Sequence, residues 1–215
     1  MRRTFGLILA VILLNLLLTG KTSAAMPDSE FVNLCQKGTF QEIESALKNG
    51  ANINSTGYID NTALMSAAGN NSDLEVSVLL LEYGADINAT SGRGSTALML
   101  AAANNPNPEI IALLLENGAD INAKRRDNGI TALIAATENK FKPVEIISLL
   151  LENGADINAE SHDGITALIA ATENKFKPVE IMSLLLEYGA DINATRAKGQ
   201  TILMHAAANA ASLEV

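Results

Sequence analysis

The sequence is poor in cysteine, histidine and aromatic residues. Its 215 residues contain one Cys, two His and no Trp, and only 4% of them are aromatic. The single cysteine, Cys35, excludes an internal disulfide and a Cys-rich metal site, and we expect it to be buried as a small apolar residue. The two histidines, His162 and His205, form no Ser-His-Asp order of the kind that indicates a nucleophilic triad. The sequence therefore predicts no catalytic, cofactor-binding or metal-binding site, and no enzyme.

Apolar residues nevertheless make up 48% of the chain. With so few aromatic side chains, the core has to be built from Ala, Leu and Ile. Such a core suits thin, repeated helix layers better than one large globule. The length allows a single compact domain or one short solenoid.

The sequence repeats itself at a regular interval. The pattern Leu-Leu-Leu-Glu-x-Gly-Ala-Asp-Ile-Asn-Ala occurs in copies that begin at Leu79, Leu113, Leu149 and Leu184. Between the copies, and at both ends of the series, a Thr precedes Ala-Leu or Ile-Leu, at Thr62, Thr96, Thr131, Thr166 and Thr201. A period of roughly 34–36 residues indicates stacked helical repeats, whose units bury their apolar faces only against neighbours.

One unit, residues 129–159, shows what each repeat should look like. Thr131 has the short hydroxyl side chain that caps a helix start, and the residues after it predict a short, Ala-rich helix. Pro143 is typical of the first position of a second helix, and Gly154 should end that helix with a positive φ. The Asp-x-Asn that follows predicts a local backbone turn, since Asp and Asn side chains bond to the backbone nearby. It does not predict a calcium site, because one carboxylate per repeat lacks the clustered oxygen ligands that calcium requires.

This unit resembles the ankyrin repeat through its Gly-x-Thr-Ala-Leu-x-x-Ala-Ala and Leu-Leu-Leu-Glu-x-Gly-Ala-Asp-Ile-Asn-Ala motifs. The family's Thr-Pro-Leu-His opening is Thr-Ala-Leu-Met or Thr-Ala-Leu-Ile here, and the turn between the helices is a residue or two longer. The resemblance implies an all-α solenoid of helix-turn-helix units joined by β-hairpin-like loops. The predicted repeats are 28–57, 58–92, 93–127, 128–162 and 163–197, followed by a truncated unit at 198–215.

The two ends of the predicted solenoid differ from its middle. Thr39 and Glu42 form a capping-box pattern at the start of the second helix, and polar side chains around it should cover the first unit. The last unit is incomplete, so we expect four apolar residues to be less well covered than their equivalents: Leu184, Leu185, Ile202 and Leu203. Weak self-association through this C-terminal layer would follow.

The N-terminus has the layout of a secretory signal. A basic start at Met1-Arg2-Arg3 precedes an apolar run from Phe5 to Leu18, and small residues follow at 22–25. The run is shorter than the roughly 20 residues that a bilayer span needs. We therefore expect residues 1–25 to be a cleaved signal peptide and the protein to be periplasmic or secreted, without stable membrane insertion. An uncleaved membrane anchor is the alternative.

Removal of residues 1–25 leaves 12 basic residues against 24 acidic ones, a net charge near −12. Such a charge disfavours nucleic acid and anionic membranes as partners. The signal sequence and the Asn- and Pro-rich turn at 104–108 resemble those of bacterial ankyrin proteins. The leading hypothesis is an exported, non-enzymatic module that binds another protein. The alternative is a self-associating structural scaffold of the cell envelope.

The resemblance implies that contacts come from the variable hairpin tips and from the concave face at the exposed ends of the inner helices. Divergent tips on a repeated frame suit recognition, although unconstrained loop drift would give the same divergence. The candidate contact residues are Tyr58, Ile59, Asn61, Arg93, Ser95, Lys124, Arg125, Arg126, Asn128, Ile130, Thr137, Glu138, His162, Ile165, Thr172 and Glu173. The basic tips, which stand out on an acidic chain, should be central to the contact.

Overall fold

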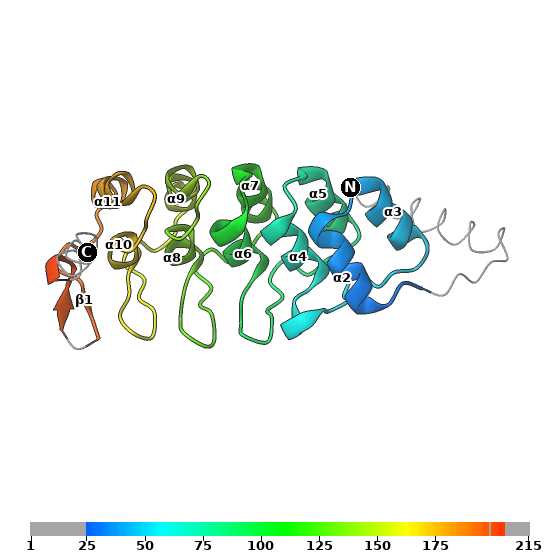
Figure 1. Cartoon of the computed structure of the whole chain (residues 1–215), viewed down its shortest axis with the longest axis horizontal. Helices are drawn as coiled ribbons and strands as arrows, with labels where there is room; N and C mark the ends of the chain where they lie inside the picture. Colours follow the sequence, from blue (N-terminus) through cyan, green and yellow to red (C-terminus); the bar gives the residue numbers. More distant parts are fainter. Residues whose placement is uncertain (1–24, 198, 205–215) are drawn as a thin grey trace.

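The computed structural model describes residues 25–197 and 199–204, which form a row of helix pairs (Figure 1). The inner helices are α2 (Asp28–Lys37), α4 (Ala63–Asn70), α6 (Ala97–Asn104), α8 (Ala132–Ala136) and α10 (Ala167–Ala171). The outer helices are α3 (Phe40–Lys48), α5 (Leu74–Glu82), α7 (Pro108–Glu116), α9 (Pro143–Glu152) and α11 (Pro178–Glu187). The predicted signal peptide, up to residue 24, and His205 lie outside the described residues.

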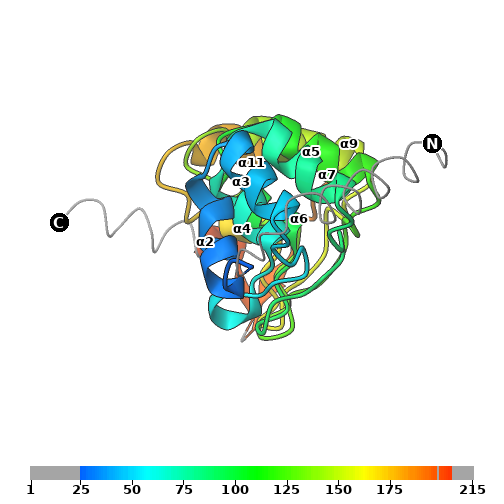
Figure 2. The same ribbon diagram turned by 90° about the vertical axis from the view of Figure 1, so that its right-hand side faces the viewer.

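The helices and the loops between them form parallel rows along the long axis. Outer helices line one side, inner helices lie in the middle, and hairpin loops line the opposite side (Figures 1 and 2). Each inner helix contacts the next inner helix, from α2 to α10, and each outer helix contacts the next outer helix, from α3 to α11. This mostly helical arrangement confirms the predicted repeat solenoid. No helix within the described residues is long and apolar enough to span a bilayer.

The inner helices begin as the sequence predicts. Thr131 has extended backbone angles, and its hydroxyl accepts a hydrogen bond from Ile134 N at 3.3 Å. The same cap occurs at the starts of α4, α6 and α10, through Thr62, Thr96 and Thr166. A side-chain cap of this kind satisfies a backbone N–H that the first helical turn leaves without a partner.

The outer helices also follow their sequence signals. Proline occupies the first position of α7, α9 and α11, and Thr39 with Glu42 forms the predicted capping box of α3. The Thr39 N–H and hydroxyl both donate to the Glu42 carboxylate, which lowers the pKa of that group. At the other end of α9, Gly154 has φ +89°, which confirms the predicted left-handed helix end.

The core consists of small and aliphatic residues. All five residues of α8 are buried, and the Ile and Leu residues of the outer helices close the core from one side. Gly69 shows how closely neighbouring inner helices approach, because a Cβ at this position would lie 3.2 Å from the Leu100 Cβ. Cys35 is buried as predicted, and burial raises the pKa of its thiol to about 12. The thiol is therefore protonated and unreactive at neutral pH.

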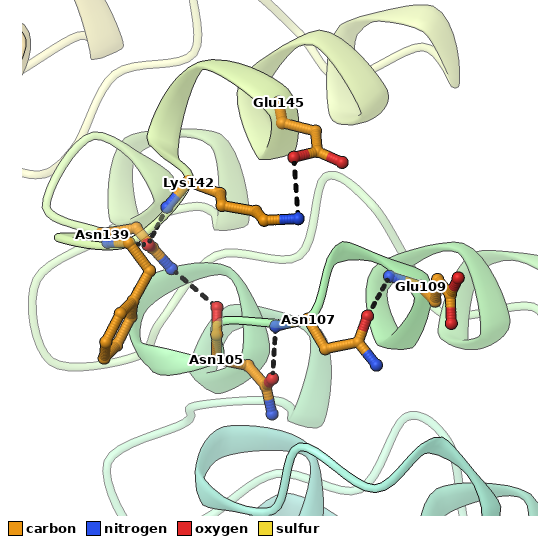
Figure 3. A network of polar contacts seen from close by, with 7 residues as sticks. Asn105, Asn107, Glu109, Asn139, Lys142 and Glu145 are labelled. Carbon is orange, nitrogen blue, oxygen red and sulfur yellow. Dashed lines mark hydrogen bonds and ion pairs between the residues drawn. The ribbon is translucent and has the colours of Figure 1, made fainter.

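A column of asparagines joins successive repeats. Asn139 is fully buried, and its amide donates to Ala102 O at 3.0 Å and to Asn105 O at 3.1 Å. Its Oδ1 accepts from the backbone N–H groups of Phe141 and Lys142, at the start of the next outer helix. Figure 3 shows this link between the repeats. Equivalent links are made by Asn71, Asn105 and Asn174.

The two ends of the described structure differ in polarity, but only part of the prediction for the C-terminal end is right. Leu203 is 77% exposed, whereas Leu185 and Ile202 are buried and Leu184 is half-buried like its equivalent Leu149. The prediction of poor cover is therefore wrong for Leu184, Leu185 and Ile202.

Candidate protein-binding surface

The hairpin tips are closed by backbone hydrogen bonds. In the second tip, Ser91 N donates to Ser95 O at 2.9 Å and Gly94 N donates to Ser91 O at 2.8 Å. The fourth tip repeats this pattern, with Ser161 N donating to Ile165 O and Gly164 N donating to Ser161 O. These bonds give the tips a defined backbone conformation.

The other tips vary this pattern. The third is one residue longer, since Gly129 N bonds to Arg125 O four positions earlier. The last forms a short antiparallel pair, β1 (Thr195–Arg196) with β2 (Gln200–Thr201). The predicted β-hairpin-like loops are therefore present.

Neighbouring tips are also bonded to one another. Gly92 N donates to Ile59 O at 3.0 Å, and His162 N donates to Asn128 O at 2.8 Å. The tips pack closely, because a Cβ at Gly94 would lie 2.5 Å from Arg126 N. The row of tips is therefore one continuous edge of the molecule, in which each tip positions the next.

The first tip presents a tyrosine on a strained turn. Tyr58 opens the short helix η1 (Tyr58–Asp60) and is 86% exposed. Ile59 and Asp60 both have positive φ, at 59° and 55°, a conformation that a β-branched residue rarely adopts. Bonding of Ile59 O to the next tip helps to hold this turn. Strained backbone of this kind is often found at functional sites.

The basic tip residues differ in how available their charges are. Arg93 and Arg126 are exposed. Arg125 is half-buried, and its guanidinium pairs with the Asp127 carboxylate at 2.7 Å, which lowers the pKa of Asp127. Lys124 is exposed, and its Nζ donates to Glu160 O at 3.0 Å. Arg93 and Arg126 are thus the better placed cations for an incoming partner, and Arg125 mainly orders its own tip.

The remaining predicted tip residues divide into exposed and supporting ones. His162 is exposed, and its ring lies against Gly129. Asn128 is half-buried and accepts from Ile130 N through its Oδ1. Residues that are half-buried below the tips are Ile59, Asn61, Ile130 and Ile165. Only parts of these side chains face solvent.

Two of the predicted contact residues are placed wrongly by the sequence interpretation. Ser95 is 7% exposed, and its N–H donates to Ser91 Oγ within its own hairpin. Thr137 is also buried, and its hydroxyl donates to Ile134 O in the last turn of α8. Neither side chain is available to a partner in this conformation. Thr172, the equivalent of Thr137 in the next repeat, is half-buried.

The ends of the inner helices form the other part of the predicted surface. Glu138 and Glu173 are both exposed there, and Glu173 lies 3.7 Å from the Arg196 guanidinium of the last hairpin. Glu138 also lines a pocket that the sequence interpretation missed, together with Asn70, Asn104, Lys140 and Phe141. The signal for this pocket in the sequence was an aromatic residue, Phe141, between two lysines in a polar turn. Lys140 Nζ lies over the Phe141 ring, 5.3 Å from the ring centroid.

Among residues 25–197 and 199–204, no group of three His, Cys, Asp or Glu side chains is arranged to hold a metal ion. The regular acidic residues instead organise the backbone. Asp156 Oδ1 accepts from Asn158 N, and Asp156 N donates to Asn122 Oδ1 of the preceding repeat. These bonds confirm the predicted turns at the Asp-x-Asn positions.

Comparison with known families agrees with this geometry. The chain matches the family described as Ankyrin repeats (3 copies), over residues 33–125, 80–161 and 133–215. The chain belongs to the ankyrin repeat family. A search of curated proteins gives no match. Ankyrin repeats are generally protein–protein interaction modules.

Proposed function

We propose that this ankyrin repeat chain is an exported, non-enzymatic interaction module that binds a protein partner through its hairpin tips and the adjoining ends of the inner helices. The observation that carries the proposal is the contrast between the regular frame of helix pairs and the variable hairpin tips. The tips are hydrogen-bonded turns that pack closely on one another, while their exposed side chains differ from repeat to repeat: Tyr58, Arg93, Arg126 and His162. A rigid backbone with variable side chains loses little conformational entropy on binding.

The chemistry of the tips favours a partner with an acidic patch beside an apolar pocket. Tyr58 offers a large, exposed aromatic ring with few rotatable bonds, and Arg93 and Arg126 offer planar cations. Tyr and Arg are the residue types that most often dominate binding energy at interfaces. The surrounding acidic chain would repel acidic proteins elsewhere on its surface, so the basic tips would also orient the encounter.

The test is a pull-down from the envelope and culture fractions with three tip variants, Tyr58→Ala, Arg93→Ala and Arg126→Ala. Each substitution should weaken the affinity for a stoichiometric partner by about tenfold if the residue is a central contact. Lys142→Ala and Lys175→Ala, in turns between helices, are matched controls because they also remove a surface side chain. Loss of the partner with the control variants, but not with the tip variants, would overturn the assignment of the surface.

Export rests on the sequence of the first 25 residues and is tested separately. Amino-terminal sequencing of the fractionated protein should give a chain that starts at Ala25 or Met26 outside the cytoplasm. An intact Met1 in the membrane fraction would instead indicate an anchor. This result does not test the binding surface, because every tip residue follows Met26 in the sequence and is retained after cleavage.

A further inference from the structure

A groove of about 670 Å³ crosses the outer helices α7, α9 and α11. The outer helices lie on the side of the solenoid away from the hairpin tips (Figure 2). The groove is therefore separate from the surface assigned to the tips. Its apolar lining includes Pro108, Ala112, Phe141, Val144, Leu149 and Leu184.

Phe141 forms one wall of the groove and contributes little to the core. Its side chain is 48% exposed, although helix pairs are stacked on both sides of its own pair. Its backbone N–H donates to the buried Asn139 Oδ1 at 2.8 Å, which orders the turn that presents the ring. The corresponding turn of the preceding repeat, residues 105–108, is one residue shorter and contains no aromatic residue. Exposed aromatic rings on an ordered backbone are typical of interface cores.

The outer helices around the groove carry charge of one sign. Each of α5, α7, α9 and α11 contains two Glu and no Lys or Arg. One Glu lies in the first turn, where the helix dipole favours it: Glu75, Glu109, Glu145 and Glu180. The other is the last helical residue, where the dipole disfavours it: Glu82, Glu116, Glu152 and Glu187.

The acidic helix ends are not required by the fold. The first layer follows the opposite rule, since α2 and α3 have Lys37 and Lys48 in their last turns. Lys and Arg are the residues that stabilise a helix end. Residues that break such a local rule without a gain in stability are often found at functional sites. The row of acidic ends therefore favours a binding role for this face.

Two carboxylates of the groove have negative charges that no cation balances. Glu109 is exposed and makes no ion pair within the described residues. Glu152 accepts hydrogen bonds from two hydroxyl groups, which orient it without cancelling its charge. Glu145, in contrast, pairs with Lys142 at 3.2 Å, close to the start of α9 (Figure 3). Lys177 also lines the groove, so its charges are mixed but acidic on balance.

The walls of the groove favour a helix over an extended segment as the occupant. The walls are helices, whose backbone groups bond within each helix, so no sheet edge is present there for a strand to extend. An incoming helix keeps its own backbone bonded and offers one apolar stripe with charged flanks. The groove has the complementary pattern of an apolar floor and acidic sides.

We infer that this groove binds a basic amphipathic helix of a partner protein. Apolar side chains of that helix pack on Phe141, Val144 and Leu149, and its Lys or Arg side chains pair with Glu109 and Glu152. This inference goes beyond the function proposed for the hairpin tips. Because the two surfaces lie on opposite sides of the solenoid, the chain can hold one partner at each (Figure 2).

A designed peptide tests the binding of such a helix to the purified protein. The probe has about 18 residues, enough to form a helix, with Leu along one face and Lys on both flanks. Fluorescence anisotropy at about 0.15 M salt, where distant charges are screened, should show saturable binding with a dissociation constant of about 10 μM or below. A peptide with Glu in place of Lys, and one with the same residues in scrambled order, should each bind at least about tenfold more weakly. Equal binding of the scrambled peptide, or no binding of the probe, contradicts the inference.

Substitutions in the protein locate the bound peptide. Phe141→Ala should weaken the affinity for the probe by about tenfold, and so should Glu109→Gln combined with Glu152→Gln. The matched control is Glu75→Gln combined with Glu82→Gln, which changes the same two helix positions on α5, outside the groove. All five side chains are exposed, so each variant should fold. An affinity that falls as much in the α5 control as in the groove variants would overturn the assignment.

The tip variants separate this inference from the proposed function. Tyr58→Ala and Arg93→Ala should bind the peptide as the wild-type chain does, even if they lose the partner of the tips. Phe141→Ala should lose the peptide and retain that partner. Loss of the peptide in the tip variants alone would place it on the tips and exclude the groove.

Discussion

Residues 129–146 and 164–181 have the same sequence but lie in successive layers. Their local structure is the same: Thr131 and Thr166 cap their helices at the same distance of 3.3 Å, and Gly129 and Gly164 have φ of 74° and 73°. Contacts between residues close in the sequence are thus reproduced wherever the segment occurs.

The environments of the two segments differ. Val144 is half-buried and Val179 is exposed, and Asn139 is fully buried where Asn174 is half-buried. Asn139 donates to two carbonyls of the preceding repeat, whereas the donor bond described for Asn174 is to Thr137 O alone. The neighbouring layers, and not the segment itself, decide how much each residue contributes to stability.

The largest expected difference is at this asparagine pair. Asn139→Ala leaves buried carbonyl and N–H groups without partners and should cost about 3 kcal/mol of unfolding free energy, whereas Asn174→Ala should cost about 1 kcal/mol. Urea titrations followed by circular dichroism measure both. Asn153→Ala is the control, because this exposed amide bonds only within its own repeat, to Leu149 O. Equal costs for Asn139 and Asn174 would contradict the layer-dependent account.

The threonine caps should show no such difference. Thr131→Ala and Thr166→Ala each remove one N-cap hydrogen bond within a segment of identical sequence. Each should therefore cost about 1 kcal/mol. The same urea titrations apply. A cost at Thr131 that exceeds the cost at Thr166 severalfold would show that even local contacts depend on the neighbouring layer.

A smaller difference is expected for the two valines. Val144→Ala removes half-buried methyl groups and should cost about 1 kcal/mol, whereas Val179→Ala should change the unfolding free energy by less than about 0.5 kcal/mol. The higher helix propensity of Ala offsets part of either loss. Measurement at low protein concentration keeps this comparison apart from any self-association through the C-terminal layer. A larger cost at Val179 would mean that its face is covered in solution.

The smallest effect concerns the capping box of the first layer. Because the folded-state pKa of Glu42 is lowered, its contribution to stability is present above the ordinary pKa of 4.5 and is lost as the pH falls through the folded-state value. The melting temperature of Glu42→Gln should therefore fall less in mild acid than that of the wild-type chain. Thr39→Val removes the hydroxyl that bonds to the same carboxylate and should shift the acid response in the same direction. An unchanged acid response in Glu42→Gln would rule out this contribution.

The features that the sequence predicts well are those formed within one repeat. Thr131, Pro143 and Gly154 act through their own backbone angles and hydrogen bonds, so their roles follow from residue type and position. The burial of Ser95 and Thr137 could not be predicted in the same way, because burial depends on how the folded chain packs and not on residue type alone. The asparagine column was visible as a regular spacing of Asn71, Asn105, Asn139 and Asn174, but its partners are carbonyls that only the stacked fold brings near.

The candidate surface shows the same division. Exposure at Tyr58, Arg93 and His162 follows from their places at hairpin tips. The pairing of Arg125 with Asp127 depends on the exact path of the longest tip, which residue types alone do not determine. The sequence interpretation therefore identified the row of tips, and the structure distinguishes its exposed side chains from its supporting ones.

A tip exchange tests the central claim, that the frame carries stability and the tips carry recognition. Lys124–Asn128 is replaced by Glu-Ser-His-Asp, the sequence of the next tip, which precedes an identical segment in its own repeat. The exchange removes the Arg125–Asp127 ion pair and the side-chain hydrogen bonds of Lys124 and Asn128, so the unfolding free energy should fall by no more than about 2 kcal/mol. Affinity for the captured partner, measured by titration calorimetry, should fall by roughly tenfold or more. Unchanged affinity in a stably folded variant would contradict the account.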